Sequence, residues 1–225
     1  MYYQAILFDL DGTLVDSIHN IAAAANHTLQ DLGYSALPLE TITAFVGRGV
    51  DALIWQCLLE HIDDSAPDPQ QYQQARRLFA QHYQHQLEHT ATPLYEGVIA
   101  GLEHFQAAGY KLAVVTNKPI AYTQTILAQT GLASYFQTVV GGDSCEEKKP
   151  HPLPLLFACA ELDSPPQRSL MIGDSINDVA AANEAHIDVL VLPYGYNAGQ
   201  PTHTLPATAH VDDLMAAFHW AQQRT

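Results

Sequence analysis

Short apolar runs alternate with amphipathic stretches along much of the chain. The apolar runs have the length and composition of buried β-strands, and they span residues 5–8, 111–116, 138–140, 169–173 and 189–192. Helical spacing of apolar positions separates the last four runs, at residues 98–108, 120–130, 153–162 and 178–185. Strands that alternate with helices predict βαβ units and a parallel sheet with helices on both faces. The pattern therefore predicts an α/β fold with a Rossmann-like core.

The segment between the first two apolar runs shows no strand-like pattern. Its apolar positions have helical spacing instead, at residues 18–33, 39–45, 50–62 and 70–88. Such a segment is far too long for a simple crossover connection. We therefore predict a helical cap, residues 17–92, inserted after the first strand of a core made of residues 1–16 and 93–225. Because ligands of open parallel sheets bind at the carboxyl ends of the strands, we expect the cap to close over the site.

Composition and charge narrow the possible partners. The chain has 24 acidic and 9 basic residues and a formal net charge of −15, which argues against nucleic acid and anionic membranes as partners. No apolar run approaches the roughly 20 residues that span a bilayer. The first predicted strand begins close to the N-terminus and leaves no room for a signal peptide. Cys57, Cys145 and Cys159 form no Cys-x-x-Cys pair and are expected to be free thiols in a reducing cytoplasm.

Two carboxylates follow the first predicted strand directly. Asp9 and Asp11 are two positions apart, and alternation along an extended chain turns such positions toward the same side. Like charges held this close need a cation or a shared proton between them. Later strands are also followed by polar residues, namely Thr116, Asn117, Lys118, Lys148, Lys149, Asp174, Ser175 and Asp178. The carboxyl ends of parallel strands meet at one edge of a sheet, so we expect these side chains to converge.

In this order, the polar motifs resemble those of the haloacid dehalogenase superfamily. The motifs are Asp9-Leu10-Asp11-Gly12-Thr13, Thr116-Asn117-Lys118-Pro119, Lys149-Pro150-His151-Pro152 and Gly173-Asp174-Ser175-Ile176-Asn177-Asp178. Residues 16–17, 46–49 and 194–197 are similar to the phosphoglycolate phosphatase-like branch of that superfamily. The resemblance runs nearly from end to end of the chain. It implies phosphatase activity on a small phosphorylated metabolite.

The paired carboxylates suit a phosphate-ester cleavage that proceeds in two steps. Asp9, at the strand end, is the expected nucleophile. Asp11 is the expected acid and base, because it can protonate the leaving alkoxide and later accept a proton from the attacking water. The family resemblance implies an aspartyl-phosphate intermediate on Asp9.

Carboxylates without nitrogen or sulfur neighbours favour Mg²⁺, a hard cation that prefers oxygen ligands. The resemblance implies that Asp9, Asp174 and the backbone carbonyl of Asp11 are the metal ligands. Asp178 and Ser175 are expected around these ligands rather than on the metal. Asp178 could order metal-bound water or hold the catalytic lysine, and its alternative role is to cap the helix that follows.

The expected phosphate site combines a lysine with groups at a strand end. Lys149 is expected to neutralise charge on the transferring group, and it is preferred to Lys148 because the family pattern places its lysine just before Pro-His-Pro. The hydroxyl of Thr116 and free backbone N–H groups at Asn117 and Gly12 are expected to bind phosphoryl oxygens. Capping of the next helix is a compatible role for Thr116 and Asn117. Lys118 is predicted to be a solvated neighbour.

The predicted cap carries Arg48 between Gly47 and Gly49. Glycines let the backbone approach a ligand closely, and a guanidinium pairs with a carboxylate in a bidentate fork. We therefore expect Arg48 to bind the carboxylate of 2-phosphoglycolate, with a surface helix cap as the alternative. On this hypothesis, loss of the Arg48 head group raises KM for phosphoglycolate and spares neutral phosphate esters.

The leading hypothesis is a cytoplasmic, Mg²⁺-dependent phosphatase that is a monomer or a homodimer. Its expected substrate is a small phosphomonoester, and the resemblance implies 2-phosphoglycolate. Alternatives within the superfamily are a phosphatase for another metabolite, such as a sugar phosphate, and a sugar-phosphate mutase. An alternative of another class is a non-catalytic module that binds a protein partner. Such a module would be free to lose one of Asp9, Asp11, Lys149 and Asp174, and all four are present.

Overall fold

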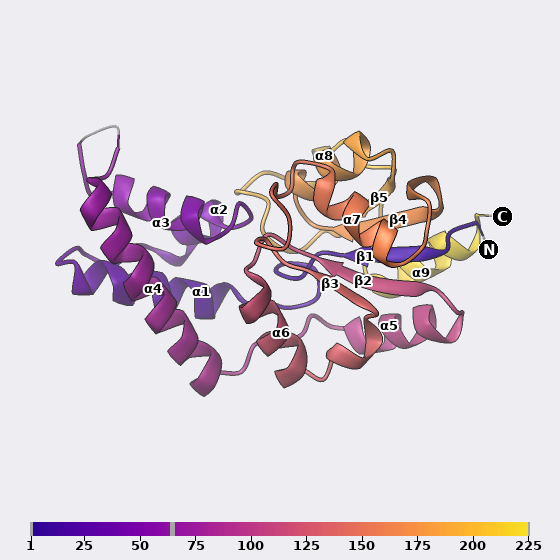
Figure 1. The fold of residues 1–225 in the computed structure, drawn as a ribbon, viewed down its shortest axis with the longest axis horizontal. Helices are drawn as coiled ribbons and strands as arrows, with labels where there is room; N and C mark the ends of the chain where they lie inside the picture. The colour runs from indigo at the N-terminus through magenta and orange to yellow at the C-terminus, as the bar shows by residue number, and fades with distance from the viewer. Residues whose placement is uncertain (1, 64–65, 225) are drawn as a thin grey trace.

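Within the described residues, six parallel strands form the sheet of the larger part of the molecule (Figure 1). The structure is a computed structural model that describes residues 2–63 and 66–224. The strands lie in the order β3-β2-β1-β4-β5-β6. Their bounds are β1 (Ala5–Phe8), β2 (Lys111–Val115), β3 (Thr138–Val140), β4 (Ser169–Gly173), β5 (Asp188–Val191) and β6 (Ala209–His210). This strand order is that of doubly wound, Rossmann-like sheets, and the predicted α/β fold class is confirmed.

The register of the sheet brings the carboxyl ends of the central strands to one level. Phe8, the last residue of β1, lies beside Val114 of β2 and Ile172 of β4. The backbone N–H of Asp9 extends this ladder by donating to the carbonyl of Ile172 at 3.0 Å. The segments that follow β1, β2 and β4 therefore leave the sheet at the same edge, where open α/β sheets bind their ligands.

Alternate strand residues point to opposite faces of the sheet, and helices cover both faces. Ile6 and Phe8 belong to a hydrophobic cluster with α5, α6 and α9, whereas Ala5 and Leu7 belong to a second cluster with α7 and α8. Figure 1 shows the two sets of helices on either side of the strands. These helices are α5 (Val98–Ala107), α6 (Ile120–Gln129), α7 (Leu153–Glu161), α8 (Ile176–Glu184) and α9 (Leu214–Gln222). Burial on both faces explains the almost uninterrupted apolar character of the strands.

Four helices between β1 and α5 lie together beside the sheet, at the left of Figure 1. They are α1 (Ile18–Asp31), α2 (Leu39–Phe45), α3 (Val50–Leu59) and α4 (Pro69–His89). α1 packs along α4, and α2 and α3 complete the group through contacts with α1, with α4 and with each other. We call α1–α4 the cap. The boundaries predicted for the cap, residues 17–92, and for the core, residues 1–16 and 93–225, stay a prediction.

The two segments that join the cap to the sheet pair with each other. Val15 and Leu94 form an antiparallel bridge. The N–H of Asp16 donates to the carbonyl of Pro93 at 2.9 Å, and the N–H of Tyr95 donates to the carbonyl of Leu14 at 3.2 Å. The connection is therefore a two-stranded junction next to the carboxyl edge of β1, which places the cap over that edge.

Some elements of the second half of the chain were not predicted from the sequence. β6 has only two residues, too few for an alternating pattern to be recognised. α9 buries Leu214, Ala217 and Ala221, and Leu214 packs where Gly101 of α5 leaves room. Short 3₁₀ turns, η1 (Ala133–Tyr135), η2 (Pro166–Arg168) and η3 (Thr202–Thr204), precede β3, β4 and β6.

Candidate active site

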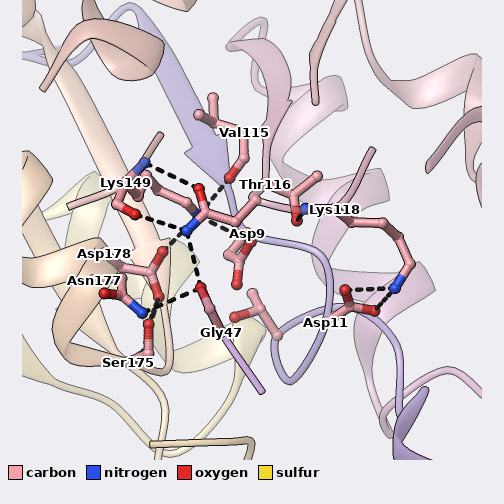
Figure 2. A network of polar contacts seen from close by, with 12 residues as sticks. Asp9, Asp11, Gly47, Val115, Thr116, Lys118, Lys149, Ser175, Asn177 and Asp178 are labelled. Carbon is pink, nitrogen blue, oxygen red and sulfur yellow. Dashed lines mark hydrogen bonds and ion pairs between the residues drawn. The ribbon is translucent and has the colours of Figure 1, made fainter. Parts of the chain in front are cut away.

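A buried lysine lies at the centre of the carboxyl edge. The Nζ atom of Lys149 donates to Oδ1 of Asp9 at 2.9 Å, to Oδ1 of Asp178 at 2.6 Å and to the carbonyl of Val115 at 2.6 Å. An ammonium group has three donors, so each of them has an acceptor here. Burial alone would lower the pKa of Lys149, but the carboxylates of Asp178 and Asp9 outweigh burial and raise it. Lys149 is therefore a fixed positive charge in the site (Figure 2).

Asp9 combines burial with a position at the end of the central strand. Its side chain keeps 12% of its surface exposed, so one part of the carboxylate is open to a ligand while Oδ1 is held by Lys149. Burial raises the pKa of Asp9 to about 6, although the ammonium of Lys149 opposes the shift. The carboxylates of Asp178 and Asp11 add to the rise. Such a group is charged at neutral pH and gains stability from any further cation.

Asp174 is held tightly beneath the loop that follows β1. The hydroxyl of Thr13 donates to its Oδ1 at 2.7 Å, and the N–H of Tyr196 donates to its Oδ2 at 2.6 Å. A Cβ atom on Gly12 or on Gly195 would lie 2.4 Å from Oδ2 of Asp174, so both positions require glycine. Burial and then the charges of Asp9 and Asp178 raise the pKa of Asp174 well above its ordinary value. Gly12, expected to bind phosphate, packs against this carboxylate.

Asp178 holds the buried lysine and also caps the helix that follows β4. It holds Lys149 through Oδ1, and its Oδ2 accepts from the N–H and the hydroxyl of Ser175 at 3.1 and 2.7 Å. The second set of bonds caps the start of α8. The side chain of Asp178 is fully buried, so Lys149 and the cap of α8 together compensate its charge. Ser175 therefore acts on Asp178 rather than on the open part of the site.

Three carboxylates at this edge form a group that could hold a metal ion. Oxygen atoms of Asp9, Asp174 and Asp178 lie within 4.8 Å of one another. Burial, and then repulsion from the neighbouring carboxylates, raises the pKa of Asp9 and of Asp174, and a divalent cation would relieve that repulsion. The donors are all oxygen, which fits a hard cation such as Mg²⁺. Asp178 is a member of this group, although the sequence placed it around the metal ligands, whereas the carboxylate of Asp11 lies outside the group.

Asp11 points away from Asp9 and is bound by a second lysine (Figure 2). The Nζ atom of Lys118 lies 2.8 Å from Oδ1 and 2.6 Å from Oδ2 of Asp11, and the hydroxyl of Ser17 also donates to Oδ1 at 2.5 Å. The ammonium of Lys118 also lies 5.1 Å from the ring centroid of Tyr83, which belongs to α4 of the cap. Asp11 is therefore bound by Ser17 from the segment after β1 and by Lys118 from the segment after β2. Lys118 in turn contacts the cap.

The prediction that Lys118 is a solvated neighbour is wrong. Its side chain is only 4% exposed, because Tyr83 of the cap covers it and Asp11 compensates its charge. Burial alone would lower the pKa of Lys118, but the carboxylate of Asp11 outweighs burial and raises it. Sequence reasoning missed this residue because fully buried lysines are rare and the partner Tyr83 is distant along the chain. The position of Lys118 directly after a predicted strand was the sequence signal that could have placed it in the site.

Thr116 and Asn117 line the same edge in different ways. The hydroxyl of Thr116 accepts a long bond of 3.3 Å from the N–H of Lys118. The amide of Asn117 is fully engaged: Nδ2 donates to the carbonyls of Lys149 and Gly47 at 2.7 and 2.9 Å, and Oδ1 accepts from the N–H of Lys149 at 2.9 Å. The side chain of Asn117 therefore holds the backbone of Lys149. Phosphate binding at this residue stays a prediction for its backbone N–H.

The loop between α2 and α3 brings the cap to the sheet edge. The carbonyl of Gly47 accepts from Nδ2 of Asn117 at 2.9 Å and from Nδ2 of Asn177 at 3.2 Å. Gly47 and Gly49 line the cavity below, whereas Arg48 is exposed and is not among the lining residues. The structure therefore brings the two glycines to the site and leaves the predicted carboxylate-binding residue at the surface.

A cavity that is partly open to solvent lies between the cap and the sheet edge. Its polar side carries the charged groups of the site, and its cap side is apolar. The polar lining is Asp9, Asp11, Thr116, Asn117, Lys118, Lys149, Ser175, Asn177 and Asp178. The cap contributes Ile21, Val46, Val50, Leu53, Phe79 and Tyr83. A small ligand held here would meet charge on one side and a water-excluding surface on the other.

The strand order, the carboxylates at the carboxyl edge and the buried lysine between them define an α/β enzyme that works on an anionic ligand. The chain belongs to the haloacid dehalogenase-like hydrolases, whose family model matches residues 6–192. This assignment confirms the superfamily that the motifs predicted.

Relatives match the chain over nearly its whole length. The phosphoglycolate phosphatase of Nitrosospira multiformis is 41% identical over 220 residues, which cover 98% of this chain and 96% of that protein. The crystal structure of a predicted phosphoglycolate phosphatase from Haemophilus somnus has 32% identity and a TM-score of 0.93, with 99% of each chain covered. CbbY from Rhodobacter sphaeroides, solved in complex with phosphate, has 27% identity and a TM-score of 0.78 over 94% of this chain and 95% of its own.

These findings confirm the predicted branch of the superfamily and the predicted enzyme class, a phosphomonoester hydrolase. Phosphatases of this family generally use a divalent metal ion, and the group of Asp9, Asp174 and Asp178 could hold one. Among the helices in the described parts of the chain, none combines the length and the apolar composition that a membrane crossing needs.

Proposed function

We propose that the protein is a Mg²⁺-dependent phosphatase whose substrate is 2-phosphoglycolate, which it converts to glycolate and phosphate. One observation carries the mechanism: the carboxylate of Asp9 lies at the end of the central strand, held by Lys149, with one part of it open to the cavity between the cap and the sheet edge. A nucleophile in such a place meets the phosphorus of a bound ester directly. The name shared by the full-length relatives supports the substrate.

The reaction then needs two displacements at phosphorus. An oxygen of the Asp9 carboxylate attacks phosphorus, the bond from phosphorus to the glycolate oxygen breaks, and Asp11 gives its proton to that oxygen. Water next attacks the phosphorus of the aspartyl phosphate, and Asp11 takes a proton from it. Phosphate leaves and the Asp9 carboxylate is restored, so the enzyme returns to its first state.

Other residues of the chain hold the transferring group. Lys149 neutralises charge on the phosphoryl oxygens, and Asp178 and the carbonyl of Val115 keep its ammonium in place. The hydroxyl of Thr116 and backbone N–H groups after β1 and β2 bind the same oxygens. Asp9, Asp174 and the carbonyl of Asp11 would hold Mg²⁺, which supplies positive charge that offsets the repulsion between a carboxylate and a phosphate.

A panel of phosphate esters tests this proposal. The panel contains 2-phosphoglycolate, 2-hydroxyethyl phosphate, a sugar monophosphate and a sugar bisphosphate, each assayed with MgCl₂ and with EDTA. The expected result is Mg²⁺-dependent phosphate release with the highest kcat/KM for 2-phosphoglycolate. The Asp9→Asn variant is expected to release no phosphate, and release that survives in it would overturn the covalent mechanism. A higher kcat/KM for a sugar phosphate would replace the substrate and keep the enzyme class.

We further infer that the enzyme works in the cytoplasm on a soluble metabolite, without a nucleic acid or membrane partner. Cys57, Cys145 and Cys159 are free thiols, which suits a reducing compartment. The net charge of −15 opposes binding to polyanions, and the local charges of Lys118 and Lys149 overcome it inside the cavity.

A further inference from the structure

Two of the nine Lys and Arg residues line the cavity, namely Lys118 and Lys149. They differ in how firmly their partners are fixed. Lys149 is bound by two buried carboxylates and a backbone carbonyl, and one of those carboxylates also caps α8. Among the residues that the structure describes, Asp11 is the one carboxylate that pairs with Lys118. Lys118 is therefore the cation in the cavity whose partner an incoming anion can replace most readily.

The ammonium of Lys118 is buried and therefore needs a negatively charged partner whether or not a ligand is bound. Its ammonium is buried between the sheet edge and the cap, with the ring of Tyr83 at 5.1 Å. Phe79 and Leu53 of the cap line the same cavity. An unpaired charge in a place of this kind is strongly destabilising. A bound molecule without a negative group near Lys118 would therefore leave the pair of Lys118 and Asp11 intact.

We propose that Lys118 is a specificity-determining residue: its ammonium binds the carboxylate of the substrate in place of the carboxylate of Asp11. The inference rests on the proposed phosphatase function and deepens it, because it makes a short phosphorylated carboxylic acid the class of substrate. In 2-phosphoglycolate the carboxylate carbon is two bonds from the ester oxygen that Asp11 protonates. An ammonium in contact with Asp11 is therefore within reach of that carboxylate.

On this proposal, the preference for the carboxylate depends on Lys118. A neutral substrate of the same size leaves Lys118 paired with Asp11 and lacks the bond that phosphoglycolate gains. The hypothesis that Arg48 binds the carboxylate predicts otherwise, because Arg48 is exposed, lies outside the cavity lining and has no contact with Asp11 that the structure describes. On that hypothesis, Lys118 would have no effect on the choice between substrates.

A matched pair of substrates tests the proposal on the wild-type enzyme. 2-Hydroxyethyl phosphate replaces the carboxylate of 2-phosphoglycolate by a neutral hydroxymethyl group of similar size. We expect kcat/KM to be about 10- to 100-fold higher for phosphoglycolate, since a bond between charged groups in a buried site is lost with the neutral ester. Equal kcat/KM values for the two esters would overturn the proposal whether or not any variant folds.

Variants then assign the effect to a residue. Lys118→Met is expected to lower kcat/KM for phosphoglycolate about 10- to 100-fold and to lower kcat/KM for the neutral ester less, so that the preference for phosphoglycolate is lost. Lys148→Met is the matched control: it removes the same charge close to the site but outside the cavity lining, and we expect the ratio of the two kcat/KM values to stay as in the wild type. Equal losses for both esters in Lys118→Met, or loss of the preference in Arg48→Ala alone, would contradict the proposal.

The two proposals fail in different ways. If the wild-type enzyme hydrolyses none of the esters with MgCl₂, the proposed function itself is wrong. If it hydrolyses both esters and the preference for the carboxylate is absent or independent of Lys118, the phosphatase function stands and the role of Lys118 is wrong.

Discussion

Asn117 and Lys149 form a reciprocal pair in which one side chain holds the backbone of another residue. The amide of Asn117 donates to the Lys149 carbonyl at 2.7 Å and accepts from the Lys149 N–H at 2.9 Å, and the two residues are 32 positions apart. This pairing fixes the loop after β3 to the end of β2. It also fixes the position of the Lys149 backbone, from which the ammonium reaches Asp9. The geometry of the ion pair between Lys149 and Asp9 therefore depends on an amide that contacts neither charged group.

The first prediction concerns Asn117→Ala. The change leaves the N–H and the carbonyl of Lys149 without buried partners, so we expect the free energy of unfolding to fall by about 2 kcal/mol. Displacement of Lys149 is expected to lower kcat up to about 100-fold with a smaller change in KM. Steady-state kinetics and thermal unfolding measure both effects. If the Asn117 side chain bound substrate phosphate instead, KM would change more than kcat.

Asn183→Ala is the matched control for this variant. Asn183 is exposed, and its Nδ2 donates to the carbonyl of Pro206 at 3.1 Å. Loss of this surface bond is expected to leave kcat as in the wild type and to change the free energy of unfolding by less than about 1 kcal/mol.

A second prediction links metal binding to pH. Burial raises the pKa of Asp9 from 3.8 to about 6, and the pKa of Asp174 is raised as well. Between about pH 4 and about pH 6, Asp9 keeps its proton in the folded protein and loses it in the unfolded chain. Without metal, the free energy of unfolding therefore falls as pH rises over this interval. Mg²⁺ replaces the protons. The Tm difference between MgCl₂ and EDTA is therefore expected to grow over this interval and then to level off.

Thermal unfolding at a series of pH values measures this difference. The Asp174→Asn variant provides the control, because it removes one carboxylate of the group and keeps a side chain of nearly the same shape. We expect its Tm to respond little to MgCl₂ at any pH. A Tm difference in the wild type that is constant from about pH 4 to about pH 7 would show that these carboxylates do not exchange protons for the metal.

The sequence was sufficient to predict β1 to β5 and the helical segment between β1 and α5, because these features follow from the periodicity of apolar positions. It was insufficient for Lys118, since the burial of this side chain depends on Tyr83, which only the folded cap brings near. The same reason hid Gly195, whose importance comes from the Asp174 carboxylate beside it. Contacts between distant segments carry no local signal, and the positions of Arg48 and Lys118 relative to the cavity are of this kind.

The third prediction uses two glycines with positive φ. In Gly195→Ala the added methyl would lie 2.4 Å from Oδ2 of Asp174, at a φ of +103°. Asp174 must move, so the Mg²⁺ concentration that gives half-maximal activity is expected to rise at least about tenfold. Gly131→Ala has a φ of +75° and no atom within 4 Å of the added methyl. It carries the backbone strain alone, about 1–2 kcal/mol, and its Mg²⁺ requirement is expected to equal that of the wild type.

The comparison separates strain from contact. Equal increases in the Mg²⁺ requirement of the two variants would mean that the packing of Gly195 against Asp174 does not organise the acidic group. A higher Mg²⁺ requirement in Gly195→Ala alone would agree with the structure, since both residues have positive φ and Gly195, unlike Gly131, contacts a predicted ligand.

The last prediction concerns the attachment of the cap. The carbonyl of Gly47 accepts from Asn117 of the strand end and from Asn177 of α8, so the loop between α2 and α3 is tied to the sheet edge by two amides. Asn177→Ala removes one tie and leaves the bonds around Lys149 intact. A neutral hydrogen bond contributes about 1 kcal/mol, so the open form of the cap should become about fivefold more populated. We expect amide exchange at residues 46–50 to accelerate by a similar factor and KM to rise, while kcat changes little.

Asn26→Ala separates this effect from general loss of hydrogen bonds. Asn26 bonds to the N–H and the carbonyl of Leu37 at 2.8 and 3.0 Å, entirely within the cap. This variant loses more bonds than Asn177→Ala, yet neither of them joins the cap to the sheet. It is expected to be less stable and to keep the wild-type KM and the wild-type exchange at residues 46–50. If Asn26→Ala raised KM as much as Asn177→Ala did, cap stability rather than the contact at Gly47 would control access to the cavity.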